Sequence, residues 1–438
     1  MKKTFKGFNY EKVPLPIRRF INSWIGFYFF GYPYKKLKII GVTGTSGKTT
    51  TTTLLYKIAM GLGYKAGLIG TVENFIAGKK ISNDFFEEAG KSIWGKIFFS
   101  STGTTPEIWE LNKILSKMVK EGCEYVFMEV SSHGLEEKRV SRLKFSGAVF
   151  TNLSHDHLDF HKNMENYFLA KRKLFKMLPK KAFALSNADD EYGERILQGI
   201  KAHEFLYGLE ECQRRSLACF QGKILKLDFS GLELDFNGEK IRSKLLGKFN
   251  AYNLLSTWSA CKLLDFDMKK VKEILQNLEP PRGRFDRFVS PDGVLVIIDY
   301  AHKPDALKNV LLTIKEIKSA EGKIISVFGC GGDRDPSKRS VMGKIGASLS
   351  DIAIFTSDNP RSEDPDAIIQ SMKKYLTEEE SRKVKTIANR RLAILEAVKL
   401  AQKGDIVLCA GKGHEDYQEI KGVKKHFNDM EEFKKAFI

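Results

Sequence analysis

The stretch G-V-T-G-T-S-G-K-T-T-T-T-T at residues 41–53 decides the fold of this chain. An apolar run at 37–40 precedes it with the character of a buried strand, and a helical pattern follows at 54–60. Glycines at the end of a strand let backbone N–H groups approach phosphate oxygens, and the start of a helix adds its positive dipole. Lys48 supplies a point charge, and Thr49 supplies a ligand for Mg²⁺. The stretch therefore predicts an ATP or GTP site.

The spacing of these glycines differs from the strict phosphate-loop pattern G-x-x-x-x-G-K-[ST]. That pattern requires glycine at Val42, whereas the glycines here are Gly41, Gly44 and Gly47. A glycine-rich turn that only caps a helix is the alternative. Such a turn needs neither the lysine nor the run of threonines, so we favour the nucleotide site.

The bulk composition sets further bounds. A chain of 438 residues is too long for one core, which predicts two or three domains. The net charge of +18 is interspersed with 54 acidic residues and forms no basic block, so we predict a solvated surface and no nucleic-acid partner. The six cysteines form no C-x-x-C pair, which predicts reduced thiols in a cytoplasmic protein.

The segment 20–34, F-I-N-S-W-I-G-F-Y-F-F-G-Y-P-Y, is strongly aromatic. It is too short and too interrupted by Gly and Pro to span a membrane, and it lacks the cleavage site of a signal peptide. Lysines and arginines on both sides suit contact with the inner face of a membrane or with a protein. Packing of a helix against the first domain is the alternative, and the sequence leaves both open.

Strand-like runs alternate with helical patterns along much of the chain, which predicts βαβ units and a parallel sheet covered by helices. Residues 204–244 instead carry short β-type stretches with turns, which predicts a small antiparallel excursion. Two prolines and a glycine at 279–283 mark a boundary. We expect a short N-terminal segment (1–36), a central nucleotide-binding domain (37–281) and a C-terminal α/β domain (282–438).

Beyond this boundary four apolar strands each run into a polar cluster. The clusters are D-Y-A-H-K-P, G-C-G-G-D-R-D, T-S-D-N-P-R and C-A-G-K-G-H-E, beginning at residues 299, 329, 356 and 409. Because ligands of open α/β sheets bind outside the carboxyl ends of the strands, these four clusters predict one lined cleft.

Two further groups in the central part suggest a metal. Glu129 ends an apolar strand, where a carboxylate can hold Mg²⁺ directly or through water. The stretch T-N-L-S-H-D-H-L-D-F-H at 151–161 contains three histidines and two aspartates. No thiolate accompanies them, so we favour Mg²⁺ or Mn²⁺ with phosphate over zinc, while a structural role for most of these side chains is the alternative.

Together these motifs resemble the Mur ligases of peptidoglycan synthesis and, within them, the MurE type. The resemblance runs from about residue 37 to the C-terminus, and the motifs follow the order of the family. Those that carry it are G-T-S-G-K-T-T, S-T-G-T-T-P-E, E-V-S-S-H-G-L, T-N-L-S-H-D-H-L-D, A-K-R-K-L-F, G-K-F-N-A-Y-N, D-Y-A-H-K-P, G-C-G-G-D-R-D, D-N-P-R and G-K-G-H-E.

The resemblance implies a P-loop ATPase domain of parallel sheet, a Rossmann-like C-terminal domain, and an N-terminal UDP-binding domain that is largely missing. It also implies a monomeric ligase that uses ATP and two Mg²⁺ ions. The terminal carboxylate of UDP-N-acetylmuramoyl-L-alanyl-D-glutamate is phosphorylated, and the amine of a diamino acid, meso-diaminopimelate with the D-N-P-R form, then attacks. Since only about forty residues precede Gly41, we expect recognition of the UDP moiety to differ from that of the family.

By the same matching, each site residue has an expected role. The catalytic and metal-binding residues are Lys48, Thr49, Glu129, His157 and Lys171, the last as a carbamate. The ATP contacts are Gly44, Thr45, Ser46, Gly47, Lys48, Thr49, Thr50, Asn253, Arg284, Asp299 and His302. The acceptor contacts are Thr104, Thr105, Ser131 and Arg139. The contacts to the incoming amino acid are Arg339, Asp358, Asn359, Arg361, Gly411 and Glu415.

Other functions stay open at this point. A lysine-adding ligase, or another ligase of the superfamily such as a folylpolyglutamate synthetase, is the nearest alternative. A nucleic-acid-stimulated P-loop ATPase would explain the positive charge, and a non-catalytic binding protein would not need Lys48, Glu129, His157 and Lys171 together.

Overall fold

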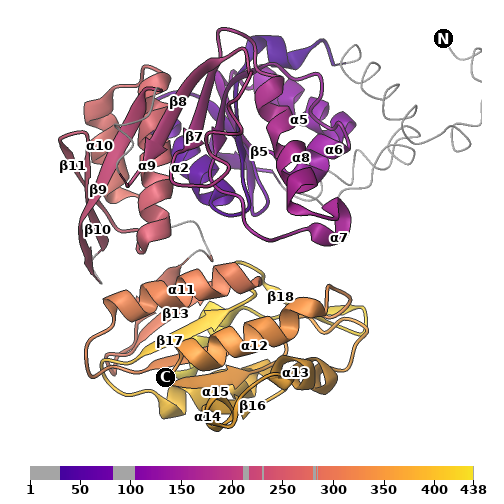
Figure 1. Cartoon of the computed structure of the whole chain (residues 1–438), viewed down its shortest axis with the longest axis vertical. Helices are drawn as coiled ribbons and strands as arrows, with labels where there is room; N and C mark the ends of the chain where they lie inside the picture. The colour runs from indigo at the N-terminus through magenta and orange to yellow at the C-terminus, as the bar shows by residue number, and fades with distance from the viewer. Residues whose placement is uncertain are drawn as a thin grey trace, which may run out of the picture. The chain divides into compact units, whose positions relative to one another are not determined.

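The computed structural model describes residues 30–81, 104–210, 217–228, 231–279, 283 and 285–437 (Figure 1). The chain divides into two compact units: Met1–Gly222 with Tyr252–Leu275, and Lys223–Ala251 with Gln276–Ile438. The chain therefore passes from one unit to the other three times. The domain boundary that the sequence suggests at 281/282 stays a prediction.

The first unit is built on a parallel sheet. Its strands are β1 (Lys38–Thr43), β2 (Ala66–Ile69), β5 (Tyr125–Glu129), β6 (Phe145–Phe150), β7 (Phe183–Asn187) and β8 (His203–Gly208). They lie in the order β8-β7-β6-β1-β5-β2, and neighbouring strands in this order are parallel. The short strands β3 (Asn74–Ile76) and β4 (Lys79–Lys80) extend the β2 edge in antiparallel fashion. The prediction of a parallel-sheet nucleotide-binding unit is confirmed.

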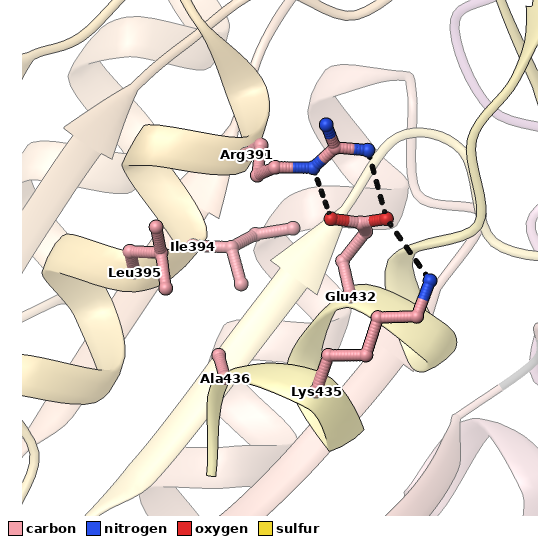
Figure 2. A pocket seen from close by; sticks show the side chains of 6 residues that line it. All are labelled: Arg391, Ile394, Leu395, Glu432, Lys435 and Ala436. Atoms are coloured by element: carbon pink, nitrogen blue, oxygen red, sulfur yellow. Dashed lines mark hydrogen bonds and ion pairs between the residues drawn. The ribbon is translucent and has the colours of Figure 1, made fainter. Parts of the chain in front are cut away.

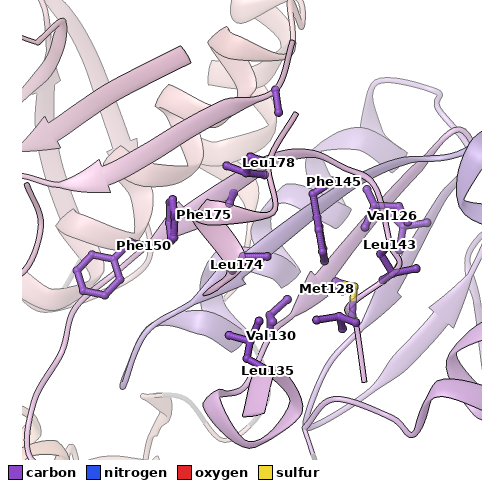
Figure 3. Packing of buried hydrophobic residues seen from close by; sticks show 14 of the residues in the cluster. Val126, Met128, Val130, Leu135, Leu143, Phe145, Phe150, Leu174, Phe175 and Leu178 are labelled. Atoms are coloured by element: carbon purple, nitrogen blue, oxygen red, sulfur yellow. The ribbon is translucent and has the colours of Figure 1, made fainter. Parts of the chain in front are cut away.

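Alternation of side chains along the strands assigns them to the two faces of this sheet. Val126, Met128 and Val130 share one buried cluster with residues of α5 (Ile108–Lys120) and α8 (Met164–Lys176), as Figure 3 shows in part. On α5 the apolar residues recur at helical spacing, which gives that helix one buried stripe. The side chain of Tyr125, which points to the opposite face from Val126, packs edge-to-face against Phe266.

The remaining helices of this part, among the described residues, all begin after the phosphate loop. They are α2 (Lys48–Gly61), α6 (Ser132–Glu136), α7 (Leu158–His161), α9 (Lys248–Leu263) and α10 (Met268–Asn277). The antiparallel excursion begins later than the sequence suggests. β8 is parallel to β7, and β9 (Cys219–Asp228) starts parallel to β8, whereas β10 (Gly231–Phe236) and β11 (Glu239–Ser243) form an antiparallel pair.

The second unit contains a six-stranded sheet in the order β12-β13-β17-β14-β15-β16 within the described residues. The strands are β12 (Asp286–Val289), β13 (Leu295–Asp299), β14 (Ile324–Phe328), β15 (Ile352–Phe355), β16 (Val384–Thr386) and β17 (Ile406–Ala410). All neighbours are parallel except β12 and β13. The prediction of a second α/β domain is confirmed.

Helices cover both faces of this sheet (Figure 1). Ile297, Phe328 and Leu408 pack with α11 (Pro304–Ile317), α12 (Ser337–Leu349) and α13 (Pro365–Lys373). Their strand neighbours, such as Ile298, Val327 and Val407, pack with α15 (Arg390–Leu400) and α16 (Asp429–Ala436). The remaining elements are α14 (Glu378–Arg382) and the hairpin of β18 (Tyr417–Ile420) and β19 (Val423–His426).

Two expectations about single segments are also tested. Cys123, Cys261, Cys330 and Cys409 are free and buried, as expected, but Cys219 is disulfide-bonded, so the prediction of a reduced thiol is wrong there. Residues 20–29 of the aromatic segment lie outside the described residues. At its described end Phe30 meets Trp109 of α5 with ring centroids 5.1 Å apart, and Tyr32 and Tyr34 pack against the core. Within the described part of the chain, no helix has the length and apolarity that a bilayer crossing requires.

Candidate active site

The phosphate loop connects β1 to α2, and two of its glycines have left-handed backbones. The φ angles are +153° at Gly44 and +84° at Gly47. A Cβ on Gly44 would lie 1.9 Å from Thr151 Oγ1, and one on Gly47 would lie 2.5 Å from Asn253 Oδ1. The loop therefore needs glycine at both positions, for conformation and for space.

Hydrogen bonds fix this loop to the segment that follows β6. The Thr45 N–H donates to the Asn152 carbonyl at 2.9 Å, and the Ser46 N–H donates to Asn152 Oδ1, also at 2.9 Å. Lys48 Nζ donates to the carbonyls of Gly44 at 2.7 Å and Thr45 at 2.9 Å. Lys48 opens α2, followed by the buried Thr49 and Thr50. The loop has the positive helix end and the ammonium that phosphate binding requires.

The register of the sheet brings Glu129 next to this loop. Val42 of β1 pairs with Glu129 of β5, at the same edge where β1 enters the loop. Glu129 is buried; its Oε1 accepts a hydrogen bond from the Thr71 N–H at 2.8 Å, and its Oε2 accepts one from Thr71 Oγ1 at 3.0 Å. No Lys, Arg or His of the described residues pairs with this carboxylate. A buried carboxylate without a cation, beside a phosphate loop, fits Mg²⁺.

The described residues contain no group of three or more His, Cys, Asp or Glu side chains arranged to hold a metal. Mg²⁺ is commonly held by one or two carboxylates together with phosphate oxygens and water. Its expected ligands are Glu129, which ends β5, and the hydroxyl of Thr49, which lies in the first turn of α2.

Lys171 and His157 lie around the same loop. Lys171 of α8 is only 1% exposed, and its Nζ donates to the Gly44 carbonyl at 2.8 Å and lies 4.5 Å from the ring centroid of Tyr167. Tyr167 in turn shares a hydrogen bond of 3.2 Å with Thr45 Oγ1, and burial raises the pKa of its hydroxyl. His157 has a left-handed backbone, its Nε2 lies 3.0 Å from Asp156 Oδ2, and its ring centroid lies 6.1 Å from that of Tyr167.

The four expected acceptor residues also come together. Thr105 Oγ1 accepts a hydrogen bond from the Ser131 N–H at 2.9 Å and shares one of 3.1 Å with Ser131 Oγ. Arg139 Nη1 donates to the Thr105 carbonyl at 2.7 Å, and Thr104 Oγ1 accepts from Thr71 Oγ1 at 3.1 Å. Because Thr71 also binds Glu129, the residues expected to hold the acceptor lie beside that carboxylate.

The guanidinium of Arg139 is heavily engaged within the protein. It forms ion pairs with Glu107 at 3.0 Å and with Glu137. An acceptor carboxylate that binds Arg139 must therefore compete with two carboxylates of the chain.

The residues expected to hold the incoming amino acid lie in the second unit, where β15 and β17 end. Asn359 Nδ2 donates to Glu415 Oε2 at 2.8 Å, and Glu415 Oε2 also accepts from Lys412 Nζ at 3.1 Å. Asp358 is buried 3.9 Å from Lys412, and a Cβ on Gly411 would lie 3.0 Å from Asp358 Oδ2. Burial raises the pKa of Asp358, while the positive charge of Lys412 opposes that rise.

The two arginines of this group are held differently. Arg339 forms a two-point contact with Glu363, Nη1 to Oε2 at 2.9 Å and Nη2 to Oε1 at 2.8 Å. Arg361 Nη1 donates to the Gly332 carbonyl at 2.6 Å, and its Nε lies 3.6 Å from Glu419 Oε2. The backbone of Arg361 is left-handed, with φ of 52°, which costs about 1 kcal/mol in a residue with a side chain.

The remaining expected ATP contacts are spread over both units. Asn253 of α9 lies against Gly47 of the phosphate loop in the first unit. Asp299 ends β13 in the second unit, where its Oδ2 accepts from the Phe285 N–H at 2.7 Å. His302 Nδ1 contacts the Tyr300 carbonyl at 2.8 Å. Arg284 lies outside the described residues.

Several side chains that support these sites were not among the expected residues. Lys412 and Glu363 contact the amino-acid group directly. Asn187 Nδ2 donates to the Thr151 carbonyl at 2.9 Å, and Asp190 Oδ2 accepts from the Leu153 N–H at 2.9 Å, so the N-A-D-D turn after β7 holds the segment that carries His157. The polar cluster directly after a buried strand was a signal that could have identified that turn.

Comparisons with known proteins agree with this geometry. Residues 42–261 match the Mur ligase middle domain, and residues 283–413 match the Mur ligase glutamate ligase domain. The UDP-N-acetylmuramoyl-L-alanyl-D-glutamate–2,6-diaminopimelate ligase of Parabacteroides distasonis is 47% identical over 409 residues, covering 93% of this chain and 79% of the relative. The ligase of the same name from Clostridium botulinum is 43% identical over 411 residues, covering 92% of this chain and 78% of the relative.

Solved structures of ligases are also similar to this chain. A UDP-N-acetylmuramoyl-L-alanyl-D-glutamate–2,6-diaminopimelate ligase is 32% identical with a TM-score of 0.65, covering 96% of this chain and 83% of that one. Folylpolyglutamate synthase from Thermotoga maritima has a TM-score of 0.66 at 15% identity, covering 92% of each chain, which shows a shared fold alone.

The fold and the phosphate loop define an ATP-dependent ligase that forms C–N bonds. The chain belongs to the Mur ligase family, as its motifs predicted, and the relatives reported above carry the name of the MurE-type enzyme. This family uses ATP and Mg²⁺.

Proposed function

We propose that this protein joins meso-2,6-diaminopimelate to the terminal carboxylate of UDP-N-acetylmuramoyl-L-alanyl-D-glutamate, with conversion of ATP to ADP and phosphate. The observation that carries the proposal is the 47% identity to a ligase of that name over 93% of the chain. The contacts of Lys48 and Lys171 to the Gly44 carbonyl, and the strand register that places Glu129 beside β1, support it.

The chemistry follows from the weakness of a carboxylate as an electrophile. Transfer of the γ-phosphoryl group to a carboxylate oxygen breaks the bond to ADP and gives an acyl phosphate. The amine of the diamino acid then attacks the carbonyl carbon, phosphate leaves, and the amine loses a proton. Phosphoryl transfer depends mainly on position and on neutralisation of charge, so the loop N–H groups and Lys48 carry the first step.

The other residues have supporting roles in this scheme. Thr105, Ser131 and Arg139 hold the acceptor, and Asn253 contacts the nucleotide from α9. Glu129 and Thr49 would hold one Mg²⁺ and His157 a second, and these ions would supply charge that neutralises the phosphate oxygens. Asn359, Arg361 and Glu415 hold the incoming amino acid, with Arg339, Asp358 and Gly411 around them. Arg284, Asp299 and His302 complete the nucleotide contacts.

The experiment that tests this function measures ADP release with a panel of acceptors and amino acids. We expect release only when the UDP-linked muramoyl dipeptide and meso-diaminopimelate are both present, with a tripeptide product in the mass spectrum. Equal or better use of L-lysine would change the amino-acid assignment. Activity with a folate, or ADP release stimulated by nucleic acid in the absence of the dipeptide, would overturn the proposal.

We also propose that Lys171 is carbamylated: its neutral amine would add CO₂ and lose a proton, and the resulting carbamate anion would be a ligand for the second Mg²⁺. Its burial supports this, because a buried lysine is more readily neutral. Lys171→Ala should abolish activity, and a short added carboxylate should restore part of it. An unmodified ammonium, seen by mass or density in the presence of bicarbonate, would contradict the idea.

For its setting we propose a monomer in the cytoplasm, in which the basic and aromatic residues before Phe30 contact the inner membrane face or a protein. Deletion of residues 1–29 should weaken binding to anionic vesicles and leave the packed Tyr32 and Tyr34 in place. Vesicle binding that is unchanged by the deletion would contradict the proposed membrane contact. A dimer in light scattering would contradict the proposed monomer.

A further inference from the structure

The hairpin formed by β18 and β19, here called the 417–426 hairpin, contacts the loop that carries the D-N-P-R motif. Gln418 Nε2 donates to the Asp358 carbonyl at 2.8 Å. The Glu419 N–H donates to Asn359 Oδ1 at 2.9 Å. Both contacts reach residues of the amino-acid group, although the sequence motifs did not include the hairpin.

The backbone of Arg361 is bound on both sides by the 417–426 hairpin. The Arg361 N–H donates to the Glu419 carbonyl at 3.1 Å, and the Lys421 N–H donates to the Arg361 carbonyl at 2.7 Å. These two bonds form an isolated parallel bridge between Arg361 and Ile420. A residue with a side chain rarely adopts a φ of 52°, so the hairpin stabilises an otherwise unfavourable backbone.

The side chain of Glu419 also faces the guanidinium of Arg361. Its carboxylate lies 3.6 Å from Nε, while Nη1 donates to the Gly332 carbonyl at 2.6 Å. Arg361 and Glu419 are both partly buried, at 22% and 23% side-chain exposure. Among the described residues Nη2 donates no hydrogen bond, so the protein holds Nε and Nη1 while Nη2 can donate to a carboxylate of the substrate.

We infer that Gln418 and Glu419 are positioning residues that set the preference for an amino acid with a distal carboxylate. The inference rests on the proposed function and deepens it. Gln418 fixes the loop, and Glu419 fixes both the backbone and the guanidinium of Arg361. An amino acid such as lysine has no distal carboxylate, so its binding gains nothing from this orientation. The 417–426 hairpin therefore acts on recognition of the side-chain carboxylate and not on phosphoryl transfer.

The test compares Glu419→Gln, Glu419→Ala and Gln418→Ala with the unaltered enzyme. Glu379→Gln is the matched control, because it removes the same charge from a residue that is 85% exposed and forms only a 3.8 Å ion pair with Lys383. Steady-state kinetics give kcat and the KM for ATP, for meso-diaminopimelate and for lysine. Calorimetry gives the affinity for meso-diaminopimelate separately from turnover.

We expect the Glu419 variants to raise the KM for meso-diaminopimelate roughly tenfold, as for loss of one positioned charge-assisted contact. The KM for ATP, the kcat at saturation and the efficiency with lysine should stay within about twofold of the unaltered enzyme, since phosphoryl transfer does not use this contact. Gln418→Ala should act in the same direction and more weakly, and the control should not differ from the unaltered enzyme.

An unchanged KM for meso-diaminopimelate in both Glu419 variants would overturn the inference, and so would a loss of kcat alone or an equal loss with lysine. If Glu419→Ala unfolds early in a thermal scan, the inference is tested by Glu419→Gln, which keeps the length of the side chain. If the unaltered enzyme does not use meso-diaminopimelate at all, the proposed function fails first. If that enzyme is active and the variants match it, only the role of the hairpin fails.

Discussion

Lys48 is folded back on its own loop, with its ammonium bonded to the carbonyls of Gly44 and Thr45. Lys48→Ala should abolish ligation, with loss of several kcal/mol of transition-state stabilisation, because the charge on the transferring phosphoryl group is then uncompensated. The measurement is kcat/KM for ATP, with thermal unfolding as the check on the fold. Lys176→Ala, at the exposed end of α8, is the matched control. Near-normal turnover of Lys48→Ala would show that the phosphate loop is not the catalytic site.

Arg361 carries the choice of amino acid in the proposed function. Arg361→Ala should reduce the efficiency with meso-diaminopimelate by about 2 kcal/mol or more, as expected for loss of a charge-assisted pair to a carboxylate. The efficiency with lysine should change little, because lysine has no carboxylate at that end. Arg361→Lys keeps the charge without the two-point fork and should recover only part of the loss. Equal losses with both amino acids would contradict this role.

At the scale of elements, α15 and α16 are joined by two ion pairs of different character. Arg390 and Asp429 are completely buried, and the arginine also donates to the Ala410 carbonyl at 3.1 Å and reaches the Ser357 carbonyl at 3.4 Å. These carbonyls directly precede the two loops of the amino-acid group. In the second pair Glu432 is also buried but Arg391 is 59% exposed, and both residues line the pocket drawn in Figure 2.

Removal of one charge should therefore cost very different amounts at the two pairs. Asp429→Asn leaves the Arg390 charge buried without its partner and should lower the free energy of unfolding by about 3 to 5 kcal/mol. Glu432→Gln opens a pair whose arginine is 59% exposed and should cost about 1 kcal/mol or less. Chemical denaturation of both variants measures the difference. Similar losses in the two would contradict the burial argument.

The strands and the long helices of this chain could be predicted from the sequence because their apolar patterns are regular. Strand β14 ends at Phe328, directly before the polar cluster that begins at residue 329, and the apolar residues of α5 recur at helical spacing. The excursion after β7 was less predictable, since parallel and antiparallel edge strands share the same alternation.

The site residues show the same division. Lys48 and Glu129 were predictable because a sequence motif and a strand end place them. Gln418 and Glu419 act through hydrogen bonds to Asp358 and Asn359, which lie on a segment distant along the chain. Single-sequence patterns carry no signal for such pairs. The assignment of roles to individual residues stays a prediction that the variants above test.

At the scale of the whole molecule, the second unit takes part of its core from an earlier piece of chain. Leu246 is 1% exposed and belongs to the same cluster as Phe285 and Leu307, with Phe249 packed against it. Leu246→Ala should destabilise that unit by about 2 to 5 kcal/mol, the usual cost of a cavity in a packed core. Leu312→Ala, on the partly exposed side of α11, is the control and should cost much less.

The same feature tests where the domains divide. A fragment of residues 282–438 lacks Leu246 and Phe249, so it should unfold more readily than the second unit does in the full chain. Thermal unfolding of the fragment and of the full chain measures this. Equal stability would favour the boundary at 281/282 over the interleaved division.

Interleaving also gives the order of synthesis a consequence. Leu246 leaves the ribosome well before the strands that bury it, the last of which, β17, ends at Ala410. At typical elongation rates of about 5–20 residues per second, that interval lasts on the order of ten seconds. During it an apolar segment near the middle of the nascent chain waits for its partners. A chaperone that recognises extended apolar chain can bind this segment during that interval.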